Sequence, residues 1–206
     1  MKLINKTALV AAGLLTSGVA MADFSANAGW VSEYHFRGIF QKNSSAYGGL
    51  DFEQNGFYAG TWAADVGDGL EVDGYFGYGG EIEGFSYGVG FTGYYYTGDF
   101  DDTYQEINVS LGYDWLSIEG AFGEYENFDG PTQDYTYYAI TGEYGGFYGK
   151  YAGFTQDFDG NYFEFGYGWD FEGVDLSVSL ILADDDLIGD EDETIVFGIG
   201  KSFDLD

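Results

Sequence analysis

Polar and apolar residues alternate with a period of two from Phe24 almost to the end of the chain. Between Asn27 and Arg37, the ionisable side chains occupy odd positions and most of the aromatic ones occupy even positions. Such alternation is typical of a β-strand whose two faces meet different surroundings. The pattern predicts an all-β chain of about twelve strands, over residues 25–40, 45–54, 57–66, 70–82, 85–96, 103–113, 116–125, 134–144, 147–155, 161–170, 174–183 and 193–203.

The length of these segments indicates where the strands lie. Most contain 9 to 13 residues, whereas strands of soluble proteins usually have about five or six. A tilted strand that crosses a membrane needs about 9 to 11 residues, and a sheet in lipid must close on itself to pair every backbone group. The segments therefore predict an antiparallel transmembrane β-barrel. Its apolar face would meet lipid, and four aromatic residues on that face are expected at the membrane interfaces: Trp30, Trp62, Tyr113 and Trp169.

The connections alternate between two kinds. Five are tight, at 54–56, 83–84, 114–115, 145–146 and 172–173. The others tend to be longer and acidic, at 42–45, 67–69, 97–102, 126–133, 156–161 and 184–193. Outer-membrane barrels have short periplasmic turns and longer extracellular loops. This asymmetry predicts the same orientation here, with an even strand count that places both termini in the periplasm.

The first 22 residues have the features of a secretory signal. Lys2 and Lys6 precede a mostly apolar stretch at 8–20, and Ala20-Met21-Ala22 forms an A-x-A cleavage site. No later stretch approaches the roughly 18 to 20 apolar residues of a spanning helix. We expect a cleaved signal peptide over 1–22 and a single barrel domain over 23–206.

The amino-acid composition argues against several classes of protein and of site. The chain has 36 Asp and Glu against 6 Lys and Arg, a formal net charge of −30. Such an acidic chain would repel nucleic acid, although acidity is also an adaptation to salty surroundings. Aromatic residues make up 21% of the chain, which argues against disorder. The absence of cysteine excludes a disulfide framework and a thiolate metal site.

Several stretches resemble a known family. They are "ANAGWVSEYHFRGI", "GGLDFEQNGFYAGTWAADVG", "EVDGYFGY" and "YQEINVSLGY". The chain resembles the TorF-type porin family over residues 24–203, most specifically in the N-terminal stretch. The resemblance implies a bacterial outer-membrane β-barrel with a pore function.

If the apolar parity faces lipid, a set of ionisable residues lines the lumen. An arginine in a narrow interior must find a carboxylate, because an unpaired buried charge is costly. Two interpretations stay open: a structural ion-pair network that plugs the barrel, or a charged constriction that selects ions. The lumen candidates are Glu33, His35, Arg37, Asp51, Glu53, Asp73, Glu106, Glu119, Lys150 and Glu164.

The function expected from these features is a porin or channel for passive diffusion of small solutes or ions, with a preference for cations. The alternatives are a non-conducting barrel with a structural or surface-binding role, and a soluble secreted acidic β-protein. We expect no enzyme, because His35 is the single histidine and has no serine beside it on its strand. No cofactor is expected.

The acidic loops are weak candidates for calcium. Carboxylates that could bind Ca²⁺ are Asp157, Asp159, Asp184, Asp186 and Asp190. The two loops that contain these residues, 156–161 and 184–193, lack the residue spacing of a twelve-residue calcium-binding loop. Acidic loops that are simply hydrated are therefore the simpler interpretation. Divalent cations bridging to lipopolysaccharide phosphates are the alternative, and the expected partners are outer-membrane lipid and lipopolysaccharide.

Overall fold

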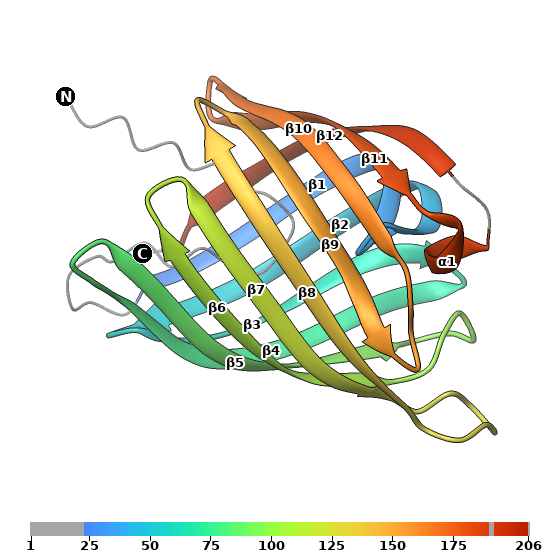
Figure 1. Cartoon of the computed structure of the whole chain (residues 1–206). Coiled ribbons are helices and arrows are strands. Elements are labelled where there is room, and N and C mark those ends of the chain that lie inside the picture. The colour runs from blue at the N-terminus through green and yellow to red at the C-terminus, as the bar shows by residue number, and fades with distance from the viewer. Residues whose placement is uncertain (1–22, 190–191, 206) are drawn as a thin grey trace.

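The computed structural model describes residues 23–189 and 192–205, so the predicted signal peptide lies outside the described residues. Twelve antiparallel strands form one closed barrel in which β1 pairs with both β2 and β12 (Figure 1). The predicted fold class is confirmed. The strands are β1 (Asp23–Phe36), β2 (Ile39–Gln54), β3 (Phe57–Gly67), β4 (Gly69–Ile82), β5 (Phe85–Tyr96), β6 (Tyr104–Tyr113), β7 (Leu116–Tyr125), β8 (Gln133–Tyr144), β9 (Phe147–Gln156), β10 (Asn161–Phe171), β11 (Val174–Ala183) and β12 (Asp192–Asp204).

The barrel is apolar outside and largely polar inside. Large hydrophobic side chains such as Phe76 and Leu111 are 54% and 64% exposed on the outer surface. Charged side chains such as Glu71, Glu106 and Lys150 are buried in the interior. This arrangement inverts that of a water-soluble domain and matches a barrel whose outer surface meets lipid. No helix within the described residues is long and apolar enough to cross a membrane.

The two ends of the barrel differ in their connections. All five predicted tight turns join strands through two residues, and backbone φ is positive at turn residues such as Asn55, Gly56, Glu172 and Gly173. Tight hairpin turns need this left-handed backbone, which glycine and asparagine adopt most easily. We call this the turn end, and the opposite end, with the connections 97–103, 126–132 and 157–160, the loop end. β1 begins and β12 ends at the turn end (Figure 1).

One loop contains a short helix that the sequence pattern does not predict. Helix α1 (Asp185–Ile188) begins after Asp184, whose carboxylate accepts a hydrogen bond from the Leu187 amide, and ends at Gly189. Asp at the N-cap and Gly after the last turn are ordinary helix boundaries. The helix is too short for any periodicity to be visible in the sequence.

The first hairpin differs from the prediction. The predicted strand 25–40 ends at Phe36, and the turn consists of Arg37 and Gly38, with φ of 50° and 86°. The predicted loop at 42–45 is wrong, because these residues belong to β2. They are polar because Lys42 forms an ion pair with Asp65 and Ser45 donates a hydrogen bond to the Asp65 carbonyl.

Tyrosines and glycines pack together on the inner face. Tyr75 on β4 lies over Gly60 on β3, where a Cβ atom would come within 2.6 Å of the Tyr75 ring. Tyr47 lies over Gly29 in the same way. Glycine is needed at these positions because the neighbouring ring occupies the space of a side chain. This packing explains part of the richness of the chain in both residue types.

The predicted outward position of one tryptophan is wrong. Trp30, Tyr113 and Trp169 are exposed on the outer surface, but Trp62 faces inward and packs against Tyr34 and Tyr47. Both faces of β3 carry apolar residues, so its alternation does not distinguish inside from outside. The inner face is apolar there because it packs against the tip of the first hairpin.

Candidate functional site in the barrel lumen

The tip of the β1–β2 hairpin leaves the barrel wall. Pairing of β1 with β12 ends at Val31, and pairing of β2 with β3 begins at Tyr47. Residues 32–46 therefore have no strand pairing with β3 or β12 and pair only within the β1–β2 hairpin, where a register shift between Tyr34 and His35 marks the bend. The tip lies beside α1 (Figure 1), where a Cβ atom on Gly38 would be 3.1 Å from the Leu187 side chain. We call residues 32–46 the inner hairpin.

Arg37, at the turn of the inner hairpin, is bound to the opposite wall of the barrel. Its two terminal nitrogens donate to the two carboxylate oxygens of Glu106 on β6, at 2.8 and 2.6 Å. The guanidinium carbon lies 4.1 Å from the centre of the Tyr137 ring on β8. A bidentate pair combined with a ring face is a strong arrangement for guanidinium. Arg37 therefore has a carboxylate partner, as expected for an arginine inside the barrel, and the structure identifies it as Glu106.

Glu106 is fully enclosed by donors. It is 1% exposed, and besides Arg37 it accepts hydrogen bonds from Tyr94 and Tyr135, each at 2.8 Å. Asn108 donates to it at 2.6 Å. These partners satisfy the desolvated charge of the carboxylate.

Further contacts bind the inner hairpin to both sides of the lumen. Tyr34 donates to Glu71 on β4, and Phe36 packs edge to face on Tyr94 with ring centroids 5.2 Å apart. Glu33 accepts hydrogen bonds from Thr194 of β12 at 2.9 Å and contacts His35 Nε2 at 3.1 Å. His35 Nδ1 is buried without a partner. The inner hairpin therefore crosses the lumen near the loop end.

The remaining lumen candidates lie on the inner face of the wall. Asp51 accepts from Tyr75 and Asn27, and Glu164 accepts from Tyr148. Strand pairing places Glu53 and Glu119 on this same inward parity. The structure thus forms two pairs among the candidates, Glu33 with His35 and Arg37 with Glu106. Asp51, Glu53, Glu119 and Glu164 are distributed around the wall.

Two buried charged candidates lack a full set of partners. Lys150 is 6% exposed and lies opposite Glu164 on the neighbouring strand, but no ion pair within 4.0 Å is formed by it among the described residues. Asp73 is 8% exposed, and its Oδ1 has no hydrogen-bond partner within the part of the chain that the structure describes. Asp73 lies directly opposite Tyr94 on β5, next to the network around Glu106.

The sequence pattern misses the tyrosines of this network. Tyr94, Tyr135 and Tyr137 surround the Arg37 guanidinium, yet each belongs to a chain with 20 tyrosines. Only their position on the inward-facing side of a strand could have identified these tyrosines from the sequence. For β8 even this is ambiguous, because apolar residues occur on both faces of the strand and the alternation does not show which face points inward.

The loop carboxylates predicted as weak calcium candidates act as caps and turn acceptors. Asp157 accepts from the Asp134 amide, Asp159 from the Gly160 amide, and Asp184 from the Leu187 and Asn161 amides. Asp186 is an exposed residue of α1, and Asp190 lies outside the described residues. Over 23–189 and 192–205, no group of three or more His, Cys, Asp or Glu residues could hold a metal ion. Calcium binding stays a prediction.

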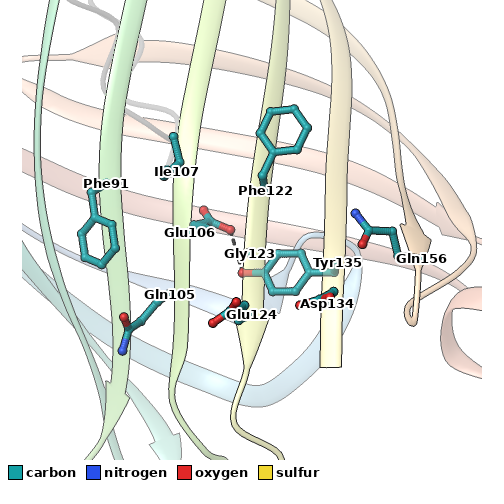
Figure 2. A pocket seen from close by; sticks show the side chains of 10 residues that line it. All are labelled: Phe91, Gln105, Glu106, Ile107, Phe122, Gly123, Glu124, Asp134, Tyr135 and Gln156. Carbon is teal, nitrogen blue, oxygen red and sulfur yellow. Dashed lines mark hydrogen bonds between the residues drawn. The ribbon is translucent and has the colours of Figure 1, made fainter. Parts of the chain in front are cut away.

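A separate pocket of about 380 Å³ lies on the outer surface of β5 to β9. Apolar side chains such as Phe91, Ile107 and Phe122 line it together with polar ones such as Glu124. Figure 2 shows the hydrogen bond between Tyr135 and Glu106 beside Gly123. The pocket is therefore a depression in the wall whose lining includes Glu106 and Tyr135, so it borders the Arg37 network.

Together, these features define a closed twelve-stranded antiparallel β-barrel, a fold that solved membrane-protein structures share. A NanC porin structure has 13% identity and a TM-score of 0.54, over 88% of this chain and 100% of that one. A structure from work on the in-meso crystallization of membrane proteins has 10% identity and a TM-score of 0.57, over 89% and 84%. Such low identities support the fold alone.

The chain belongs to the Gcw_chp family, described as bacterial proteins of unknown function, whose family model matches residues 16–179. That range covers the inner hairpin and the strands β3, β4, β5, β6 and β8 that contact it, but not β12. No curated protein matches the chain. The resemblance to the TorF-type porin family stays a prediction, because the description of the matching family states that its function is unknown.

Proposed function

We propose that this protein is an outer-membrane channel for passive diffusion of small solutes, with a preference for cations. The observation that carries the proposal is the acidic inner face of a closed barrel. Asp51, Glu53, Glu119 and Glu164 face the lumen, and the charge of Arg37 is already matched by Glu106. Rings of lining charge select ions of the opposite sign.

The proposed location is the bacterial outer membrane, with the loop end outside the cell. The apolar outer surface would contact lipid, and the acidic loops would face lipopolysaccharide. The expected signal peptide and the difference between the two ends of the barrel both support this orientation. The proposed function requires no cofactor and no catalytic group.

Reversal potentials across a salt gradient in a planar bilayer test the proposal. Refolded protein should conduct with a reversal potential of the sign for cations, and the preference should weaken as salt rises, because ions screen the lining charge. A preference for anions would contradict the proposed role of the acids. A Glu119→Gln, Glu164→Gln variant should reduce the cation preference without changing the fold.

The second candidate is a barrel that does not conduct and serves a structural or surface-binding role. The inner hairpin favours it, because Arg37, Tyr34 and Phe36 cross the lumen and bind to the wall. Protein that migrates as folded on a gel but shows no current under any voltage would favour this candidate. An enzyme is not proposed, because His35 contacts Glu33 at Nε2 and its Nδ1 contacts no nucleophile.

A further inference from the structure

The surroundings of the Arg37 guanidinium are built almost entirely by the barrel wall. Glu106 belongs to β6, Tyr94 to β5, and Tyr135 and Tyr137 to β8. Tyr94, Tyr135 and Asn108, all of them wall residues, also donate hydrogen bonds to Glu106. These donors fix the orientation of the carboxylate in advance, which lowers the cost of binding a cation.

The shape of these surroundings fits a planar cation. Guanidinium presents parallel N–H groups that match the two oxygens of a carboxylate, and its flat face stacks on an aromatic ring. Both features are present here: the two bonds to Glu106 and the Tyr137 ring at 4.1 Å. A compact metal ion would use neither the fork geometry nor the ring face in this way.

Arg37 reaches this position from a segment that the wall does not hold by strand pairing. Residues 32–46 have no pairing with β3 or β12. The arginine therefore behaves as a tethered ligand, and a short tether gives an effective concentration in the millimolar range. A free solute must compete with that local concentration.

We propose that Tyr94, Glu106, Tyr135 and Tyr137 form a binding site for guanidinium-type organic cations, which the protein's own Arg37 occupies in this structure. This inference rests on the proposed channel function for how a solute reaches the site. When the inner hairpin withdraws, a solute with a guanidinium group replaces Arg37 at the wall. The free Oδ1 of Asp73, opposite Tyr94, offers an acceptor for a further donor on such a solute.

Chemical rescue of an Arg37→Ala variant tests the site without relying on conductance. The variant removes the tethered ligand and leaves Glu106 without its cation. Methylguanidinium chloride, at about four times its Kd for the vacant site, should raise the midpoint of heat unfolding by about 2–4 °C. Tetramethylammonium chloride at equal concentration should not, because it cannot donate hydrogen bonds. The wild type should show no shift, since Arg37 already fills the site.

Two further variants keep the test specific. In Arg37→Ala, Glu106→Gln the shift should vanish, because the amide lacks the charge and the second acceptor. In Arg37→Ala, Tyr137→Leu it should shrink, because the ring face is lost. Equal shifts from methylguanidinium and tetramethylammonium, or a shift that survives Glu106→Gln, would overturn the site.

A folding failure of Arg37→Ala does not remove the test. Methylguanidinium is then added during refolding, where recovery of the folded gel band supports the site and no recovery overturns it. Rescue in a protein that does not conduct would leave the binding site standing and remove the channel. Conductance without rescue would leave the channel standing and remove the binding site.

Discussion

At the scale of single residues, the ion pair between Arg37 and Glu106 has the largest energetic consequence. Both partners are largely removed from water, and the carboxylate has no exposure. Desolvation makes each charge costly alone, so the two depend on each other. A surface pair such as Lys42 and Asp65, whose side chains are 25% and 41% exposed, contributes far less.

Replacing Arg37 with alanine should destabilise the barrel by about 3–5 kcal/mol, because Glu106 would keep a buried charge without its partner. Denaturant unfolding in detergent, followed by tryptophan fluorescence, measures the change. Lys201→Ala is the matched control, since Lys201 is an exposed cation on β12 and should change stability by less than about 0.5 kcal/mol. Equal effects in the two variants would mean that the Arg37 pair contributes nothing beyond its charge.

At the scale of elements, the contact between tyrosine and glycine joins neighbouring strands on the inner face. The Tyr75 ring lies over Gly60 and its hydroxyl donates to Asp51, so one side chain of β4 reaches across β3 to β2. This contact requires a glycine at position 60 on β3, because a side chain there would occupy the space of the Tyr75 ring. It fixes the direction of the tyrosine and thereby the position of a lumen carboxylate.

Gly60→Ala should cost about 1–3 kcal/mol, because the new methyl group would overlap the Tyr75 ring. The cost should fall in a Tyr75→Ala background, by a coupling of about 0.5–3 kcal/mol. Gly74→Ala is the control, since a Cβ atom there meets nothing within 4 Å. Equal costs at Gly60 and Gly74 in denaturant unfolding would show that the ring adapts freely.

The inner hairpin crosses the lumen, and we expect its position to control the current through the proposed channel. A Phe36→Cys, Tyr94→Cys variant, bridged by a short bis-methanethiosulfonate reagent that forms a disulfide with each cysteine, should lose its current, because the hairpin is then tied to the wall. Reduction should restore the current. The chain has no cysteine of its own, so the reagent has one target.

The control for this bridge lies on the outer surface. Phe85 and Tyr113 stack with ring centroids 4.3 Å apart on neighbouring wall strands, and bridging cysteines there should leave the current unchanged. A full current through protein bridged at Phe36 and Tyr94 would mean that the inner hairpin does not obstruct the path. Loss of current with both bridges would indicate a general effect of the reagent.

At the scale of the whole molecule, the closed sheet and its two unlike ends predict the orientation in the membrane. Asp129 in the connection 126–132 should be extracellular, whereas Trp115 at a tight turn should be periplasmic. A membrane-impermeant thiol reagent added to intact cells should label Asp129→Cys and should label Trp115→Cys only after the outer membrane is permeabilised. The opposite result would mean that the barrel is inserted the other way.

Much of this architecture is determined by the sequence alone, because it depends on local properties. Alternation with period two, strand length and turn residues such as Asn55-Gly56 act over a few positions. They predicted the closed barrel and ten of the twelve strands to within about two residues, the usual error of such boundaries, whereas β1 and β2 differ by four and six residues at the first hairpin. They also predict an inward position for Glu33, Asp51 and Glu164.

Tertiary structure decided the course of the first hairpin and the partners of its charges. Arg37 and Glu106 lie 69 positions apart, and nothing local selects this carboxylate among the 36 acids of the chain. The polar run at Lys42 resembles a loop until the hairpin bends inward and gives it Asp65 as a partner. Trp62 faces inward for the same reason, because a hairpin that fills the lumen gives an apolar side chain something to pack against. Period two specifies two faces for each strand, but which face is buried depends on what the closed barrel contains.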